Sequence, residues 1–203
     1  MRILIGCECS GAVRRAFRTI GHDAWSCDLK AAEDDSPYHI QGDVLTVLGD
    51  EWDMAVYFPD CTYLTVSGLH WNKRRPDRAE KTEAAIEFVR ALDTPEIPRK
   101  AWENPIGCLS SRWRKPDQII QPYQFGHDAS KATCLWLDNL PLLTIPPESE
   151  WSPPRIVNGR RRWANQTDSG QNKLGASPTR AMDRARTYHG IADAMAAGWG
   201  KLP

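Results

Sequence analysis

The chain has 203 residues, of which 41% are hydrophobic and 26% are charged, a composition typical of one soluble α/β domain with a small appendage. No apolar run approaches the roughly 20 residues that cross a bilayer, and nothing near the N-terminus resembles a signal peptide. We therefore expect a cytoplasmic protein with no membrane partner. The formal net charge is zero, which by itself neither favours nor excludes nucleic acid.

The N-terminal half alternates between strand-like and helix-like segments. Residues 2–6 (RILIG) are a compact apolar run that ends in glycine, the pattern of a buried parallel strand. A helix is predicted over 12–20, where Gly21 is expected to end it. A second strand over 22–28 and a short element over 43–48 follow.

Two further strands and a long helix come next. Residues 53–58 (DMAVYF) and 100–103 (KAWE) are predicted to be strands. Asp77 with Glu80 is typical of a capping box, here opening a helix that ends at Leu92. Strands separated by helices predict an α/β fold with a Rossmann-like, doubly wound and mostly parallel sheet.

The C-terminal part is less regular. Residues 118–121 and 132–137 are predicted to form an antiparallel pair at one sheet edge, and 187–199 a final helix. The segment 140–178 is rich in proline, glycine and basic residues, which indicates a small loop-rich insertion. We expect a catalytic domain made of 1–139 plus 179–203, interrupted by 140–178.

Glycines and acids gather where the predicted strands end, and ligands of such sheets bind at the carboxyl ends of the strands. A glycine loop before a helix lets the backbone approach a ligand, and an acid after the second strand can accept from ribose hydroxyls. The loop has no Gly-Lys-Ser/Thr phosphate cradle, which argues against ATP. The expected cofactor-binding residues are Gly6, Cys7, Glu8, Cys9, Ser10, Gly11, Asp28, Leu29, Asp43, Val44 and Pro59.

Cys61 and Glu103 follow neighbouring strands and suit attack on a pyrimidine. A thiolate that adds to carbon 6 makes carbon 5 nucleophilic, and a carboxylic acid at nitrogen 3 stabilises the adduct. Most of the six cysteines are expected to be buried free thiols. Cys7-x-Cys9 has no second pair, so we expect no zinc or other metal site.

In order and spacing, these motifs resemble those of the DNA cytosine-5 methyltransferases, in particular the short versions found in phage genomes. The resemblance rests on Gly6 to Gly11, Asp28, Asp43, Pro59 with Cys61, and Glu103-Asn104, and it covers roughly residues 1–137. It implies a class I fold that binds S-adenosylmethionine, with Cys61 as nucleophile and Glu103 and Asn104 opposite. It also implies double-stranded DNA with a flipped cytosine as substrate, and a location in the host cytoplasm if a phage encodes the chain.

Two departures concern the catalytic residues. Asp60 stands directly before Cys61, where the family has proline, and a carboxylate there would raise the pKa of the thiol unless Lys or Arg compensates. The family's Gln-x-Arg-x-Arg motif is replaced by residues 124–133. Lys131 or Thr133 is therefore expected to do part of its work, and Lys131 is taken as the fourth catalytic residue.

Basic residues that can bind phosphates cluster after Cys61, in a loop that would close over DNA, and again in the insertion. Trp71 either fills the gap left by a flipped base or packs in the core. Because the insertion is small, few bases can be read, and a short target sequence is expected. The candidate contacts are Trp71, Lys73, Arg74, Arg75, Arg155, Arg160, Arg161, Arg162, Trp163 and Asn165.

Two alternatives stay open at this point. The same Cys61 and Glu103 pair would serve an enzyme that modifies a free pyrimidine nucleotide or RNA. A catalytically inactive DNA-binding relic of the same fold would explain Asp60 and the missing arginines. A separate specificity subunit and a transferred group larger than methyl are also compatible with the sequence.

Overall fold

We describe a computed structural model of the chain, which covers residues 1–177 and 180–202. The strands are β1 (Arg2–Gly6), β2 (Asp23–Asp28), β3 (His39–Gln41), β4 (Met54–Tyr57), β5 (Lys100–Pro105), β6 (Gln118–Ile120), β7 (Thr133–Asp138), β8 (Arg155–Val157) and β9 (Arg160–Arg162). The α-helices are α1 (Ala12–Thr19), α2 (Val66–Leu69), α3 (Pro76–Ala91), α4 (Leu109–Arg112), α5 (Arg180–Ala185) and α6 (His189–Trp199).

Within this part of the chain, seven strands form one sheet in the order β3-β2-β1-β4-β5-β7-β6. The pairs among β1 to β5 are parallel, whereas β7 runs antiparallel to both β5 and β6. The strand order changes direction between β1 and β4, the point at which doubly wound sheets hold their ligands. The prediction of a Rossmann-like, mostly parallel sheet with an antiparallel pair at one edge is confirmed.

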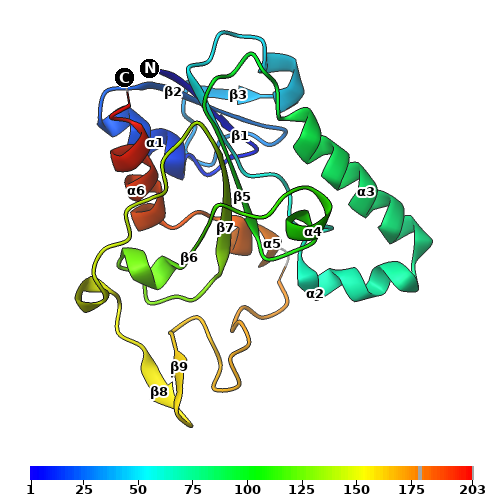
Figure 1. Cartoon of the computed structure of the whole chain (residues 1–203), viewed down its shortest axis with the longest axis vertical. Helices are drawn as coiled ribbons and strands as arrows, with labels where there is room; N and C mark the ends of the chain where they lie inside the picture. The colour runs from blue at the N-terminus through cyan, green and yellow to red at the C-terminus, as the bar shows by residue number, and fades with distance from the viewer. Residues whose placement is uncertain (178–179, 203) are drawn as a thin grey trace.

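The sheet is buried on both faces because successive side chains of a strand point to opposite sides. Ile3 and Ile5 face the layer made by α1 and α6, which lie side by side (Figure 1). Leu4 faces the other layer, where Ile86 and Val89 of α3 pack. Strands covered on both sides read as continuous apolar runs, as RILIG does.

Local differences from the prediction have physical reasons. β3 and α5 were not expected: β3 has only three residues, two of them polar, and carries no periodic signal. The capping box is wrong. Helix α3 begins at Pro76 with Arg75 as its N-cap and no side-chain cap, because proline is favoured at the first helical position. Asp77 instead lies in the first turn and pairs with Arg75.

The C-terminal region adds a small ribbon to this domain. Strands β8 and β9 pair antiparallel and project from the body of the molecule at the lower end of the view (Figure 1). Loops and one short 3₁₀ helix (Glu148–Glu150) make up most of the rest of 140–177. The division into a catalytic domain and a separate insertion stays a prediction. Among the helices of the described residues, none combines the length and the apolar character that a bilayer crossing needs.

Candidate active site

The predicted site residues follow strands that end at one edge of the sheet. β1, β2, β4 and β5 are parallel, and their registers bring Gly6 beside both Cys27 and Tyr57, and Tyr57 beside Trp102. The loops that begin after these positions therefore open at the same edge.

The glycine loop after β1 is tightly built. A Cβ on Gly6 would lie 2.7 Å from the Tyr57 ring and 2.9 Å from Val44, so only glycine fits there. Cys7 has a positive φ of 60° and donates its backbone N–H to the Cys27 carbonyl at 2.7 Å. The loop thus holds the two neighbouring strand ends together.

Glu8 is buried under the start of α1. Its Oε1 accepts from the Ser10 hydroxyl at 2.6 Å and from the Val13 amide at 3.4 Å. Its Oε2 is buried with no hydrogen-bond partner in the described structure. Burial raises the pKa of Glu8. A buried polar atom without a partner is rare in folded proteins, and a ligand amino group would satisfy this one.

Three carboxylates surround Cys7. The pKa of its thiol is raised to about 12, first by burial and then by the negative charge of Asp28, with smaller contributions from Cys27, Asp43 and Asp60. Among the side chains of residues 1–177 and 183–202, none forms an ion pair with these three acids. The region around Cys7 is therefore acidic, and it suits a ligand that brings positive charge and hydrogen-bond donors.

Of the remaining residues expected to bind a cofactor, some lie at the surface and others in the core. Leu29 is 74% exposed, whereas Val44 is buried against Gly6 and offers no side chain to a ligand. Asp43 caps a short 3₁₀ helix, its Oδ1 accepting from the Leu45 amide at 3.0 Å. A mostly apolar cavity of about 300 Å³ lies beside this edge and is of a size to take a flat ring. It is lined by Pro59, Asp60, Tyr63, Lys81, Ala84, Ala85 and Phe88.

Asp28 offers the most direct test of this acidic region. It accepts one hydrogen bond, from the Lys30 amide at 2.9 Å, and has an oxygen left for a ligand hydroxyl. For S-adenosylmethionine, the cofactor that the sequence resemblance implies, we expect Asp28→Asn to weaken binding by roughly ten- to a hundredfold, the value of a hydrogen bond to a charged group. Titration calorimetry would measure it. Asp53→Asn, at the opposite end of the sheet, is the matched control, and equal affinities in the two variants would contradict the assignment.

The loop that carries Cys61 is bonded to the end of β5 and to the loop that follows it. Asn104 donates through Nδ2 to the Pro59 carbonyl at 2.7 Å, and the Cys108 amide donates to the Leu64 carbonyl at 2.8 Å. Gly107 pairs with Thr65, and a Cβ on Gly107 would collide with the Leu64 carbonyl. Cys61 and Glu103 are thus on two segments that cannot move independently.

The charges around Cys61 oppose one another. Burial raises the pKa of its thiol, and the negative charges of Glu103 and Asp60 raise it further. The positive charges of Lys131 and Arg184 lower it. Cys61 is half-buried, whereas Cys27, Cys108 and Cys134 are buried. Asp60 therefore acts in the direction expected from the sequence, with Lys131 compensating.

The positive charge of Lys131 acts on Glu103 as well as on Cys61. Burial raises the pKa of its carboxyl group, which the charge of Lys131 and a hydrogen bond from Thr133 oppose. Asn104, next to it, is also buried, and its Oδ1 has no partner in the described structure. An acid with a raised pKa is suited to a ring nitrogen of a base, whereas Asn104, the next residue of β5, points to the other face of the sheet.

The candidate DNA-contacting residues differ in their exposure and in whether they already have partners. Trp71 is 46% exposed and contacts His70, so it is not a core residue. Arg161 pairs with Glu148, and Arg162 donates to backbone carbonyls, whereas Arg160 is exposed. Lys73, Arg74 and Arg75 are likewise exposed or paired only at the surface.

Two candidate DNA contacts of the insertion are wrong. Trp163 is buried and stacks on Tyr123, with ring centroids 4.0 Å apart and planes 7° from parallel. Asn165 uses both ends of its amide on the backbone of Ser130, at 2.9 Å each. Both side chains hold the insertion against the domain, because the Trp163 ring is buried and the Asn165 amide is oriented by its two bonds to Ser130.

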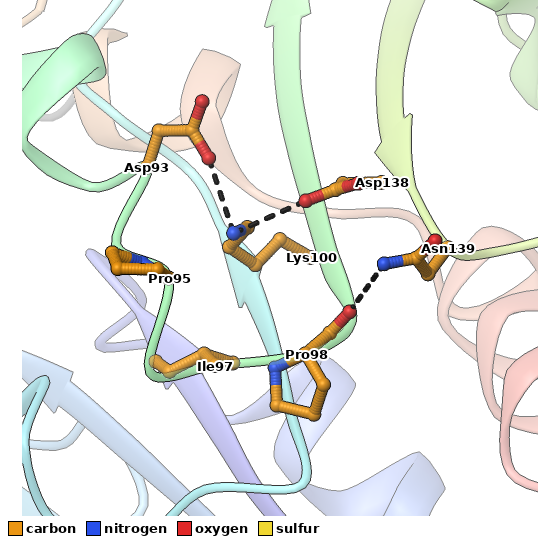
Figure 2. A pocket seen from close by; sticks show the side chains of 7 residues that line it. All are labelled: Asp93, Pro95, Ile97, Pro98, Lys100, Asp138 and Asn139. Atoms are coloured by element: carbon orange, nitrogen blue, oxygen red, sulfur yellow. Dashed lines mark hydrogen bonds and ion pairs between the residues drawn. The ribbon is translucent and has the colours of Figure 1, made fainter.

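A second cavity, of about 330 Å³, lies at the opposite end of the sheet (Figure 2). Lys100 begins β5 there, and its ammonium group meets Asp93 and Asp138 at 3.1 Å each and the Thr94 carbonyl at 2.7 Å. Asn139 donates to the Pro98 carbonyl at 2.8 Å. All three donors of Lys100 are used, so this cluster fastens two strands and leaves no donor for a ligand.

Sequence reasoning missed Gly107 and Arg184. A glycine three residues after Asn104 was visible as a signal for close backbone approach. Arg184 carried no signal, because it lies 123 positions from Cys61 in a helix that periodicity did not predict. The prediction of no metal site remains untested, although within residues 1–177 and 180–202 no group of three or more His, Cys, Asp or Glu is placed to hold an ion.

Comparison with known proteins leaves the function to be argued from this site. No protein-family model and no curated protein matches the chain. Among solved structures, it is similar to one from E. coli described as a "putative DNA modification methyltransferase encoded within prophage", with 12% identity and a TM-score of 0.48. The similarity covers 72% of this chain and 51% of that one, so the chain spans about half the length of that protein.

Proposed function

We propose that the chain is an S-adenosylmethionine-dependent methyltransferase that acts on carbon 5 of cytosine in DNA. The observation that carries the proposal is that the charge of Glu103 in β5 acts on Cys61, whose loop is bonded to β5 through Asn104, with Lys131 acting on both. The negative charges of Asp28, Asp43 and Asp60 around Cys7 and the unpartnered Glu8 Oε2 support a cationic cofactor.

The roles of the residues follow from their chemistry. The Cys61 thiolate bonds through Sγ to carbon 6 of the ring, and electron density moves toward carbon 5. Protonated Glu103 donates to nitrogen 3, while Asn104, on the other face of β5, holds the Cys61 loop through the Pro59 carbonyl. Carbon 5 gains the methyl group and then loses its proton to a water molecule. The Sγ to carbon 6 bond breaks as the ring regains its aromaticity, which releases the thiolate, and nitrogen 3 returns its proton to Glu103.

S-adenosylmethionine supplies an electrophilic methyl group on a positively charged sulfonium. Glu8 is suited to its amino group, and Asp28 is suited to its ribose hydroxyls. In the described chain each has a carboxylate oxygen that accepts no side-chain or backbone hydrogen bond. The apolar cavity beside Pro59 has room for the adenine ring.

DNA is the proposed substrate because basic side chains lie on two segments around the site. The loop after Cys61 carries Lys73 to Arg75, and the β8–β9 ribbon carries Arg160 to Arg162. A two-stranded ribbon fits the major groove, and exposed arginines can bind phosphates. Carbon 6 is inaccessible within a base stack, so the cytosine has to leave the duplex.

The decisive experiment is covalent trapping. A long duplex made with 5-fluorocytosine at every cytosine contains whatever short target the enzyme reads. With S-adenosylmethionine it should yield a protein–DNA complex stable to denaturant, because fluorine at carbon 5 cannot leave as a proton would. No complex with the wild type, or an undiminished one with Cys61→Ser, would overturn the proposal.

The alternative is modification of a free nucleotide or RNA, favoured by the small number of exposed basic residues on the ribbon. Comparing trapping on fluorinated duplex DNA, RNA and the free fluorinated nucleotide separates these substrates.

A further inference from the structure

The insertion is attached to the loop that carries Lys131. The Asn165 Nδ2 donates to the Ser130 carbonyl, and the Ser130 amide donates back to the Asn165 Oδ1, each at 2.9 Å. The Ala164 amide donates to the Asp128 carboxylate at 2.8 Å. These contacts join residues 35 and 36 positions apart, and they act on the backbone directly before Lys131.

The other side of the same loop rests on Gln121. Its Oε1 accepts from the Lys131 amide at 3.0 Å and from the Ser130 hydroxyl at 3.3 Å. The backbone at 130–131 is therefore held between the domain and the insertion. On the insertion side, the hydrogen bonds to Ser130 come from Asn165.

Hydrogen bonds and strand pairing also link Lys131, through Thr133, to β5, the strand that carries Glu103. The Thr133 hydroxyl donates to the Lys131 carbonyl at 3.1 Å, and Thr133 pairs with Pro105 in the β5–β7 ladder, two residues from Glu103. The Thr133 side chain also lowers the pKa of Glu103, and the charge of Lys131 acts on both Glu103 and Cys61.

In the opposite direction the connection reaches the ribbon. Asn165 lies three residues after Arg162, the end of β9. Between them Trp163 is stacked on Tyr123 and donates its Nε1–H to the Ser152 carbonyl at 3.1 Å. The path from β9 to Asn165 is thus fixed by packing and is not a free linker.

We propose that Asn165 is a positioning residue, whose paired bonds to Ser130 hold Lys131 beside Cys61 and Glu103 and so tie the basic ribbon to the reacting groups. The inference rests on the proposed function in that Cys61 is the nucleophile. Asn165 touches no substrate and acts through Lys131.

The test measures Cys61 alone. Cleavage after Lys and Arg releases residues 31–73, a peptide whose one cysteine is Cys61, so its labelling by iodoacetamide can be followed by mass spectrometry from pH 6 to 10. Asn165→Ala should move the labelling midpoint to higher pH and slow labelling near neutral pH by about two- to fivefold, because Lys131 stabilises the thiolate less. The other charges acting on Cys61, those of Glu103, Asp60 and Arg184, are unchanged by this variant.

Controls separate positioning from general damage. Lys131→Gln should shift the profile in the same direction, and Asn165→Ala should add nothing to it. Asn172→Ala, which removes another amide–backbone bond of the insertion, should leave the profile unchanged. If Asn165→Ala does not fold, Asn165→Ser, which keeps a single hydrogen-bonding group, takes its place with a smaller shift expected.

An unchanged Cys61 profile in a folded Asn165 variant, or shifts that add to those of Lys131→Gln, would overturn the inference. The measurement needs neither DNA nor methyl donor. A shifted profile in a protein that never forms the trapped complex would therefore count against the proposed function and leave the positioning role standing.

Discussion

Replacing Cys61 by serine is expected to lower kcat for DNA methylation by at least ~1,000-fold, because a hydroxyl near neutral pH is a far weaker nucleophile than a thiol in equilibrium with its thiolate. Binding of S-adenosylmethionine should stay within about twofold of the wild type, since Cys61 is not among the residues proposed to bind the cofactor. Methyl transfer to duplex DNA and cofactor calorimetry measure the two quantities.

The wild-type rate should also depend on pH in a defined direction. Burial, Glu103 and Asp60 raise the pKa of Cys61, so thiolate is scarce near neutral pH and the rate rises as pH increases. Glu103, whose pKa burial raises, must be protonated to act as an acid. Once Glu103 ionises, each further gain in thiolate is offset by the loss of the acid, so the rate levels off, and it falls only above the pKa of Cys61. A bell-shaped profile of kcat/KM with a level top is the expected result. A rate that does not fall toward acidic pH would argue against this pair.

The second large effect is expected for Glu103→Gln, which should lower kcat by about 10²- to 10⁴-fold, the range for loss of a positioned acid or base. Glutamine keeps the size and the hydrogen-bonding shape of the side chain, so the fold and the DNA affinity should persist. Single-turnover methylation on excess enzyme would separate the loss in chemistry from any loss in binding.

Glu103→Gln should at the same time make Cys61 easier to label. The negative charge of Glu103 raises the pKa of the thiol, and its removal leaves Lys131 and Arg184 opposed by Asp60 alone. Iodoacetamide should therefore label Cys61 faster in this variant than in the wild type while methylation falls. A merely damaged protein would not keep its affinity for DNA while losing its chemistry, so both quantities have to be measured on the same preparation. Loss of DNA affinity in parallel with activity, or slower labelling of Cys61, would contradict the assignment of Glu103.

Much of the fold followed from periodicity. The apolar runs at 2–6 and 53–58 are strands because a sheet covered on both faces requires apolar side chains at every position. Parallel pairing then brings the ends of β1, β2, β4 and β5 to one edge without further assumptions. The grouping of the glycine loop, Asp28 and Cys61 was therefore predictable from local pattern plus one rule of topology.

What local pattern could not supply were contacts between distant residues. Trp163 and Asn165 are of residue types that read bases, yet one stacks on Tyr123 and the other bonds to the backbone of Ser130 at both ends of its amide. Polarity alone does not say which partner a side chain finds, because that depends on loop paths without a periodic signal.

The sequence by itself determined the sheet, its edge, and the cysteine and glutamate presented there, since each depends on short-range apolar spacing and on residue type. Only the tertiary structure decided which charges act on the pKa of the Cys61 thiol, because Lys131 and Arg184 are 70 and 123 positions away from it along the chain. It also decided that Glu8 holds a buried oxygen with no partner within the described residues. Electrostatic effects depend on distance through space and on exclusion of water, and neither quantity is encoded in the neighbours of a residue along the chain.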